Sequence, residues 1–457
     1  MLKEVTAVFD IGKTNKKFFL FDTNFKEVYR RYIELEQIVD EDGYPTENID
    51  ALHRWMKAVF HEILNAKKYD ITSINFSSYG ASWVHLNERG QVIAPLYNYT
   101  KELPKDLIAT FYKTYGPELA FGQTTGTTNS GMLNAGMQLY WLKHQKPHLY
   151  KKIKWSMHLP QYLSYMFTGI PVSEYTSIGC HTALWDYDKQ DYHSWVYQEG
   201  IHEKLAPIVA AETSINMKYN QKRLKIGVGI HDSSSALLPY VRSIDSKFVL
   251  LSTGTWSICL NPFSNGILSK NDVADNCINY MRINGEPVKA SRLFLGHLYN
   301  TKTEWLANYF NKPVDYHKKV AFDSHIIDNL TTGNSHYFTS QQIENSNSDQ
   351  QIHIPFKSYE VAYHQLVLEL VELQVSYIKK AIGQDVITNL YMDGGFANNL
   401  IFVELLSRAL PSMKIKTTDA SLGSALGAAI AISNVKLDGQ FLHKNYALKK
   451  HSPLITT

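Results

Sequence analysis

Apolar runs that stop abruptly at Gly, Thr, Ser or Asp recur along the chain, and the first predicts a β-hairpin. Val5–Phe9 and Lys17–Asp22 are strand-like, and the polar segment Asp10–Lys16 joins them. Asp, Gly, Thr and Asn are residues that tight turns favour. The phosphate-binding motif G-x-x-x-x-G-K-[ST], which leads into a helix, does not occur in this segment. The pattern therefore predicts a strand, a turn and a second strand.

The same pattern returns in the middle of the chain. Lys247–Leu251 is apolar, Ser252–Thr255 is polar, and Trp256–Leu260 is strand-like again. Two such hairpins predict two similarly built halves, and 457 residues suffice for two hydrophobic cores. We place the boundary near 240–246 and predict domains over 1–243 and 244–440, followed by a tail over 441–457.

Helical and strand-like segments alternate around these hairpins, which predicts an α/β fold. Apolar residues at helical spacing mark the helices, and short apolar runs mark the strands. The small residues of Leu422–Ile430 suit close packing of two elements. The predicted helices are Ala51–Asn65, Leu133–His144, a start at Ser233–Leu238, Tyr359–Ile382, Asn399–Leu410 and Leu422–Ile430; the further strands are Ile71–Phe76, Ile226–Ile230, Asn389–Met392 and Lys414–Thr417; 335–351 is a predicted surface loop.

Composition and charge exclude several classes of protein. The net charge of +3 gives no basic surface for nucleic acid or an anionic membrane. No apolar run approaches the roughly 18 residues that span a bilayer, and the N-terminus lacks a signal-peptide pattern. Cys180, Cys259 and Cys277 suggest neither a disulfide framework nor a metal cluster, and we interpret Cys180 and His181 as structural. We expect a cytoplasmic protein.

The first hairpin turn carries residues suited to a triphosphate and its metal ion. Asp10 ends the strand, where a carboxylate suits Mg²⁺, directly or through water. Gly12 permits close backbone approach, while Thr14 and Asn15 offer donors. A plain polar turn would have the same composition. Pairing with Ser252–Thr255 favours the functional interpretation, because two threonine-bearing hairpins facing each other across a cleft would clamp phosphates.

Asp232 is the residue we expect to act as catalytic base. It follows a short apolar strand, and open α/β sheets bind their ligands at the carboxyl ends of strands. An ionised aspartate there would orient an attacking hydroxyl and accept its proton. Asp232 also suits the N-terminal cap of the next helix, and the two roles are compatible. His231 would bind sugar hydroxyls, or it is a structural histidine.

Two further segments have candidate binding residues. Gly394 and Gly395 follow a strand and would let the backbone approach a nucleotide, with Asn398 and Asn399 at the next helix start. A glycine turn with a helix cap is the alternative. Ser82 and Trp83, with Tyr79 and Gly80, form a candidate sugar platform, since aromatic faces stack on sugar rings. The alternative for Trp83 is a core side chain on a strand.

These motifs together resemble the FGGY family of carbohydrate kinases, within the actin-like ATPase superfamily, over nearly all of residues 5–435. Asp10–Asn15 is similar to the family's first phosphate loop, D-x-G-T-T-N/S, and Ser252–Ser257 to its second. Asp393–Gly395 is similar to the adenosine loop. Gly229–Asp232 resembles the G-x-H-D segment that carries the catalytic aspartate, and Ser424–Ala429 resembles the A-L-G-A-A helix start.

The resemblance implies two actin-like, ribonuclease H-like α/β domains with a nucleotide and sugar cleft between them. It implies that Asp232 is the base and that Asp10 and Asp232 hold Mg²⁺. The residues implied for ATP are Gly12, Lys13, Thr14, Asn15, Thr253, Gly254, Thr255, Gly394, Gly395 and Asn398. Those implied for the sugar are Gly80, Ser82, Trp83, His231 and Asp232.

Within the family the chain leans toward the branch that includes rhamnulokinase and fuculokinase. Tyr79–Val84, Leu159–Gly169 and Glu174–Ser177 carry this likeness. The departures are Lys13 in place of a small hydroxyl residue, Phe396-Ala397 in place of Gly-Ser, Ser82 in place of Asp, and a poor match over Arg292–Trp305.

The expected activity is ATP- and Mg²⁺-dependent phosphorylation of a primary hydroxyl of a small sugar. A ketose or deoxyketose such as L-rhamnulose or L-fuculose is the expected substrate. The alternatives are a different substrate of the family such as xylulose or ribulose, a hexose or acetate kinase of the actin-like superfamily, and a non-catalytic sensor of sugar or nucleotide. The expected partners are the sugar and ATP, without nucleic acid or membrane; a homodimer is left open.

Overall fold

The computed structural model describes residues 2–219, 222–330, 336–339, 354–420 and 422–451 in two compact units. The first unit consists of Met1–Asp245, Pro262–Lys289 and Leu422–Phe441. The second consists of Ser246–Asn261, Ala290–Ser421 and Leu442–Thr457. The chain first changes unit inside the predicted boundary region. The chain later returns to the first unit twice, whereas the prediction divided the two domains at a single point.

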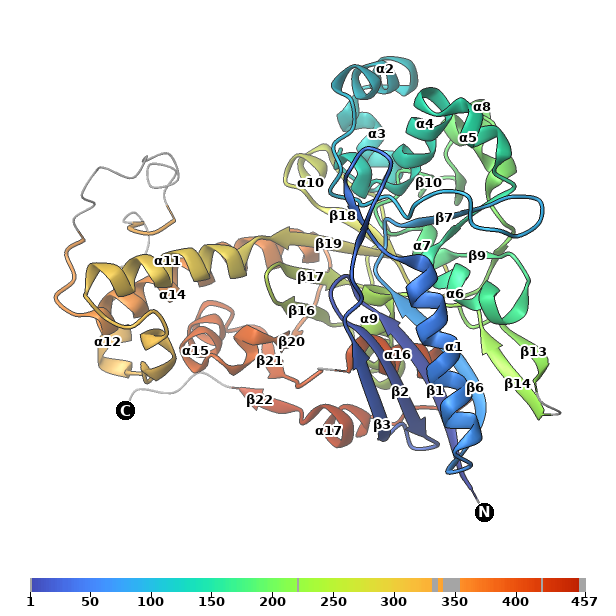
Figure 1. The fold of residues 1–457 in the computed structure, drawn as a ribbon. Coiled ribbons are helices and arrows are strands. Elements are labelled where there is room, and N and C mark those ends of the chain that lie inside the picture. The colour runs from blue at the N-terminus through green and yellow to red at the C-terminus, as the bar shows by residue number, and fades with distance from the viewer. Residues whose placement is uncertain (1, 220–221, 331–335, 340–353, 421, 452–457) are drawn as a thin grey trace. The chain divides into compact units, whose positions relative to one another are not determined.

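A mixed seven-stranded sheet forms the centre of the first unit (Figure 1). Its order is β13-β14-β6-β1-β2-β3, with β15 also pairing with β6. β1 is antiparallel to β2, as the first hairpin predicts, and parallel to β6. The strands are β1 Lys3–Ile11, β2 Lys16–Asp22, β3 Glu27–Ile33, β6 Tyr69–Ser78, β13 Ser214–Tyr219, β14 Lys222–Gly227 and β15 Ile230–His231.

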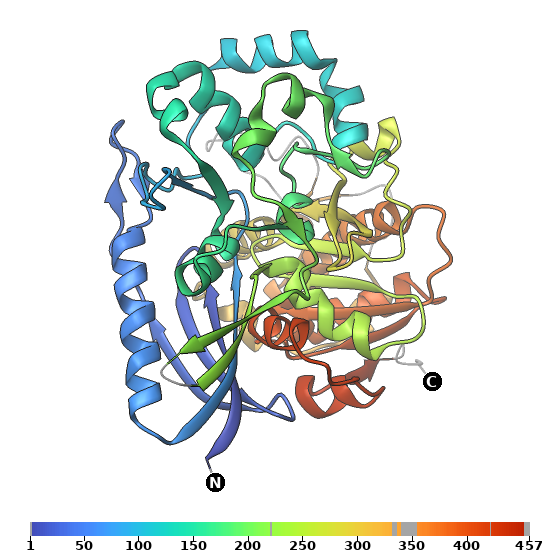
Figure 2. The same cartoon turned by 90° about the vertical axis from the view of Figure 1, so that its right-hand side faces the viewer.

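Side chains of β1 alternate between two differently covered faces of this sheet. Val5, Ala7, Phe9 and Ile11 share a core with residues of helices α1 (Ile49–Asn65) and α6 (Leu159–Thr168). The even-numbered residues face helices α9 (Asp232–Ser243) and α16 (Gly423–Ala431), on the side of the sheet away from α1 (Figure 2). Asn75, opposite Val8 in the β1–β6 ladder, donates to the Ala428 carbonyl at 2.7 Å. Asp10 therefore belongs to the α9 and α16 face.

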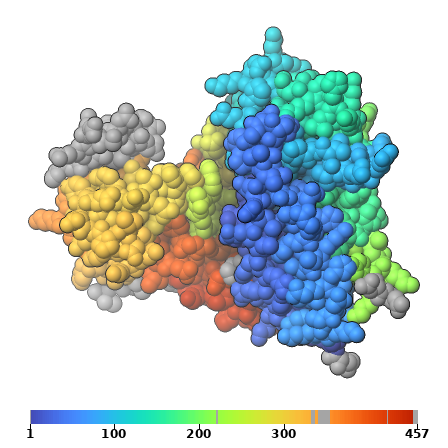
Figure 3. Space-filling model, viewed as in Figure 1, coloured from blue at the N-terminus to red at the C-terminus, as the bar shows by residue number. Residues whose placement is uncertain are grey.

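A largely helical segment continues the first unit between β6 and β13, and its surface is cyan to green in Figure 3. Its core contains Trp83, Phe111, Trp141 and Trp195, all buried. The remaining elements of the unit are β4 Ile38–Val39, β5 Pro45–Thr46, β7 Trp83–Leu86, α2 Lys105–Tyr115, α3 Glu118–Thr125, η1 Gly131–Leu133, α4 Ala135–Gln145, α5 Pro147–Lys152, β8 Trp155–His158, β9 Ser173–Glu174, α7 Tyr175–Ile178, β10 Trp185–Asp186, β11 Asp191–Tyr192, α8 Ser194–Gln198, η2 Ile201–Lys204, β12 Ile208–Val209, α10 Lys270–Ala274 and β18 Ile278–Met281.

The second unit repeats the strand pairing of the first. β16 is antiparallel to β17 and parallel to β20, as β1 is to β2 and β6. β20 is parallel to β21, β21 is antiparallel to β22, and β19 lies beside β17. The elements are β16 Val249–Thr253, β17 Ser257–Asn261, β19 Pro287–Leu293, α11 Leu295–Tyr309, η3 Tyr316–Lys319, α12 Ser324–Asp328, α14 Tyr359–Ile382, β20 Asn389–Gly394, η4 Gly395–Asn398, α15 Leu400–Ala409, β21 Lys414–Thr417, α17 Phe441–Tyr446 and β22 Lys449–His451; β19 and α17 both begin in the first unit.

Most predicted elements are present, and α14 and β21 have the predicted bounds. The predicted strand Ile226–Ile230 is wrong as one strand, because the chain breaks between β14 and β15. There Gly229 has φ +85° and lies against the Pro160 carbonyl. The predicted tail is also wrong up to His451, because β22 joins the sheet. Most of the predicted 335–351 loop lies outside the described residues. None of the helices within the described ranges is both long and apolar enough to cross a bilayer.

Helix α9, which begins at Asp232, is fixed against α16 by a close crossing. A β-carbon on Gly427 would lie 1.8 Å from the Ser235 carbonyl oxygen, so the backbones meet without a side chain between them. The Ser235 hydroxyl donates to the Ser424 carbonyl at 2.6 Å. The small residues predicted for this helix thus have a structural reason.

We expect Gly427→Ala to destabilise the first unit by about 1–3 kcal/mol, because the added methyl group has no space at the crossing. Urea unfolding followed by fluorescence measures this change. Gly439→Ala is the control, since a β-carbon there meets no atom within 4 Å. Equal unfolding midpoints for the two variants would contradict the close crossing.

Candidate active site

Two carboxylates lie at one edge of the first unit's sheet. Strands β1, β6 and β15 are parallel, and Asp10 pairs with Ser77 while His231 pairs with Ser78. Asp232 follows as the first residue of α9. The carboxyl ends of these strands therefore bring Asp10 and Asp232 to the same edge, where α/β sheets bind ligands.

Burial changes the protonation of both carboxylates. It raises the pKa of Asp10 to about 6, against the opposing effect of Lys17, whose Nζ lies 3.9 Å from Asp10 Oδ2. The charge of Asp232 raises the pKa of Asp10 further. Burial likewise raises the pKa of Asp232 to about 6, although the Ser233 N–H donates to its Oδ1 at 2.6 Å. Burial disfavours the negative charge of each carboxylate, and a bound divalent cation would offset both charges. Mg²⁺ prefers oxygen ligands, which both carboxylates supply.

His231 is a neutral side chain beside Asp232. Burial lowers its pKa to about 3, and its Nε2 lies 3.2 Å from Asp232 Oδ1. Its backbone N–H donates to Thr176 Oγ1, and that hydroxyl donates to the buried Glu174. Glu174 also accepts the N–H groups of Thr176 and Ser177, which caps α7. Sequence reasoning did not identify this positioning role of Glu174.

The predicted phosphate turn is closed by a hydrogen bond from the Gly12 N–H to the Asn15 carbonyl at 3.0 Å. Thr14 and Asn15 are exposed at its tip. Lys13 turns away from bulk solvent, with its Nζ 5.5 and 5.3 Å from the ring centres of Tyr79 and Tyr99. Burial lowers the pKa of this ammonium group. The turn thus presents two exposed polar residues and one sheltered cation.

The predicted sugar residues separate into two groups. The backbone of Gly80 lies against His231, since a β-carbon there would be 3.1 Å from His231 Nε2. Trp83 is a core residue whose ring stacks on that of His158, with 3.7 Å between the ring centres. Its indole N–H donates to the Ala135 carbonyl. Ser82 is 1% exposed. The expectation that Trp83 and Ser82 form a sugar platform is wrong in this structure, because packing covers both side chains.

In the second unit, the β16–β17 hairpin uses one of its threonines structurally. The Thr253 hydroxyl donates to the Asp393 carbonyl and accepts the Phe396 N–H at 3.2 Å. Gly394, at φ +84°, has no room for a side chain beside the Thr253 carbonyl. We therefore correct the prediction for Thr253: its hydroxyl joins β16 to β20, and Gly254 and Thr255 form the exposed turn.

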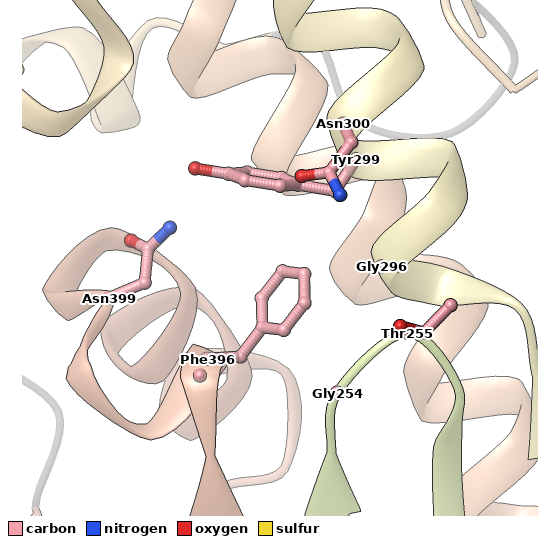
Figure 4. A pocket seen from close by; sticks show the side chains of 8 residues that line it. Gly254, Thr255, Gly296, Tyr299, Asn300, Phe396 and Asn399 are labelled. Carbon is pink, nitrogen blue, oxygen red and sulfur yellow. The ribbon is translucent and has the colours of Figure 1, made fainter. Parts of the chain in front are cut away.

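A hollow of about 280 Å³ lies beside this turn (Figure 4). The rings of Tyr299 and Phe396 lie 5.0 Å apart at 71°, and Asn399 points toward the same space. Of the two predicted asparagines, Asn399 lines the hollow and Asn398 is not among its lining residues. The lining residues are Gly254, Thr255, Gly296, Tyr299, Asn300, Gly395, Phe396 and Asn399.

Helix α11 contributes three lining residues that sequence reasoning missed. Gly296, Tyr299 and Asn300 have the i, i+3, i+4 spacing of one helix face, and this spacing is the signal that could have revealed them. A β-carbon on Gly296 would lie 2.2 Å from the Gly254 carbonyl oxygen, so the helix meets the turn closely. An apolar ring pair, backbone groups and two side-chain amides suit a nucleotide.

Comparison with family models matches both halves of the chain. Residues 5–233 match the N-terminal domain of the FGGY family of carbohydrate kinases, and residues 245–440 match the carbohydrate kinase FGGY C-terminal domain. A rhamnulokinase of Yersinia pestis (strain Pestoides F) is 27% identical over 232 residues, 49% of this chain and 46% of the relative. A rhamnulokinase of Halalkalibacterium halodurans is 22% identical, over 54% of each chain. In the Yersinia match, the chain spans about half the length of the relative.

Solved structures show the same fold. A carbohydrate kinase from Novosphingobium aromaticivorans superposes with a TM-score of 0.80 at 22% identity, over 98% of this chain and 97% of that one. Ligand-bound xylulose kinase from Lactobacillus acidophilus gives 0.76 at 15% identity, over 99% and 94%. The family models span most of the sequence, and the two-unit α/β fold agrees with them: the chain belongs to the FGGY family of carbohydrate kinases.

Proposed function

We propose that this protein transfers a phosphoryl group from ATP to a primary hydroxyl of a small sugar, with Mg²⁺. One observation carries the proposal: Asp232, at the carboxyl edge of the first unit's sheet, has a partly exposed carboxylate beside Asp10. Family membership and the hollow of about 280 Å³ in the second unit support it. We assign the acceptor sugar to the first unit and the nucleotide to the second.

Asp232 acts as the base in this proposal. Its Oδ1 accepts the Ser233 N–H and lies 3.2 Å from His231 Nε2, which fixes the carboxylate. Its Oδ2 has no hydrogen-bond donor among the described residues and is the oxygen we assign to the sugar hydroxyl. At neutral pH the carboxylate is ionised, so it orients that hydroxyl and accepts its proton late in the transfer.

The metal and the nucleotide have separate places in the proposal. Asp10 and Asp232 would hold Mg²⁺, which offsets phosphate charge when bound. Gly254 and Thr255 would donate to phosphates, and Tyr299 and Phe396 would contact the base. Gly12, Thr14 and Asn15 are further proposed phosphate donors.

For the substrate we propose a ketose or deoxyketose such as L-rhamnulose or L-fuculose. The rhamnulokinase relatives at 27% identity favour this class. Xylulose or ribulose is the second candidate, on the likeness to xylulose kinase structures, which is a likeness of fold. We further propose a cytoplasmic location. The alternative function, a non-catalytic sensor, would bind the sugar without phosphorylating it.

We expect Asp232→Asn to lower turnover about 10²–10⁴-fold while ATP still binds, because the amide cannot accept the proton. ADP release with Mg-ATP measures turnover against L-rhamnulose, L-fuculose, D-xylulose, L-xylulose, L-ribulose, D-ribulose, glycerol and gluconate. Asp106→Asn, also in the first turn of a helix, is the control. Unchanged turnover in Asp232→Asn would remove Asp232 as the base, and sugar binding without turnover in the unaltered protein would favour a sensor.

We expect Asp10→Asn to raise the Mg²⁺ concentration for half-maximal activity about tenfold, because a metal ligand is lost. In the unaltered protein, activity should decline as the pH falls through about 6, where the two carboxylates take up protons. Higher Mg²⁺ should shift this decline to lower pH, since metal and protons compete. Asp188→Asn, on an exposed turn, is the control. A Mg²⁺ titration identical to that of the control would contradict the role of Asp10.

We expect Gly395→Val to raise the KM for ATP about tenfold and to leave the KM for the sugar unchanged. A β-carbon there meets no atom within 4 Å, so the new side chain enters the hollow without disturbing the fold. Steady-state kinetics with each substrate varied in turn measures both constants, and Gly439→Val is the control. A raised KM for the sugar alone would mean that the hollow does not hold the nucleotide.

A further inference from the structure

Three side chains with metal-binding atoms meet inside the first unit. Cys180 and His181 follow helix α7, and His231 ends strand β15. One ligand atom from each lies within 4.8 Å of the other two, and all three residues are buried. Cys180 Sγ is 3.0 Å from His231 Nε2. Their spacing does not predict this group, because two of the residues are adjacent and the third lies about fifty positions away.

The donor set differs in kind from that of the two carboxylates. One sulfur and two imidazole nitrogens suit Zn²⁺ and related thiophilic cations, whereas Mg²⁺ prefers oxygen. Bond lengths of about 2.3 Å to sulfur and 2.0–2.1 Å to nitrogen place tetrahedral ligands roughly 3.3–3.6 Å apart. The separations here, from 3.0 Å to at most 4.8 Å, bracket that range.

The surrounding chain already orients one of the imidazoles. His181 Nδ1 lies 3.1 Å from the Leu133 carbonyl oxygen, which can only accept, so Nδ1 carries the proton. Its Nε2 is therefore the nitrogen with the lone pair. A backbone carbonyl that fixes the tautomer in this way is a regular feature of metal-binding histidines. His181 also has φ 41°, a left-handed conformation that the fold must hold.

The group adjoins the proposed sugar site. His231 Nε2 faces both Cys180 Sγ and Asp232 Oδ1, at 3.0 and 3.2 Å. The backbone of Gly80 lies against the same two side chains, Cys180 and His231. A metal ion on Cys180 would take the His231 nitrogen that now faces the carboxylate, and it would occupy space beside the assigned base.

We propose that Cys180, His181 and His231 form a binding site for Zn²⁺ or a similar thiophilic divalent cation. We further propose that metal bound there excludes the sugar; this second statement rests on the proposed function. Binding replaces the thiol proton of Cys180, which passes to solvent, so affinity rises with pH. The site gives the enzyme sensitivity to zinc that is separate from its use of Mg²⁺.

Titration of the full, chelator-treated chain with Co²⁺ tests the site without any activity measurement. We expect one cobalt per chain with a cysteinate charge-transfer band, displaced by Zn²⁺ and retained in excess Mg²⁺. Cys180→Ser should lose the band or bind about tenfold more weakly. His181→Asn should also weaken binding, and it preserves the fold because Asn tolerates the left-handed conformation. Cys277→Ser, at an equally buried cysteine, is the control.

No cobalt band in the unaltered chain, or equal binding by Cys180→Ser and the control, would overturn the site. Inhibition by Zn²⁺ that added sugar relieves would support the exclusion, and inhibition that sugar leaves unchanged would overturn it. A band that depends on Cys180 in a protein without kinase activity would support the metal site while the proposed function fails. An active kinase that shows no cobalt band would support the proposed function and overturn the metal site.

Discussion

The register of three parallel strands determines where the charged groups of the first unit lie. β6 pairs with β1 so that Ser77 meets Asp10, and it pairs with β15 so that Ser78 meets His231. Side chains alternate along a strand, so a shift of one residue would turn Asp10 toward α1. The apolar residues Val5, Ala7, Phe9 and Ile11 prevent that shift, because their burial requires the opposite face. Hydrophobic packing on the α1 face of the sheet thus determines that the charge of Asp10 lies on the opposite face.

The same packing explains why the carboxylates have raised pKa values. Asp10 is 6% exposed, so water solvates its charge poorly, and Lys17 at 3.9 Å compensates in part. Glu174, although fully buried, has a different role because it accepts four hydrogen bonds from Gln161, Thr176 and Ser177. The buried Glu174 therefore has a structural role, whereas Asp10 and Asp232 are the carboxylates that we propose for the cation.

Sequence reasoning succeeded where local pattern determines the outcome. The amphipathic run of α14 and the pairing of the first hairpin are visible in the residues alone. It failed where distant segments decide. Trp83 is a core residue because His158 covers the face of its ring. The Thr253 hydroxyl donates its hydrogen bond to a neighbouring strand. The lining residues of α11 share one helix face, but what that face meets depends on tertiary contacts. The meeting of Cys180 with His231 likewise depends on tertiary contacts.

Helix α16 has a consequence for how the chain folds during synthesis. It covers the even-numbered face of β1, and its Ala428 carbonyl accepts a hydrogen bond from Asn75, yet it lies near the end of the chain. A ribosome must therefore translate nearly all of the second unit before the first can be completed. Until then α16 leaves its part of the β1 and β6 face uncovered, and α9 lacks the partner that fixes Asp232. The first unit begins folding early but cannot be completed until α16 has been made, so we expect nascent chains to expose part of that face during most of their synthesis.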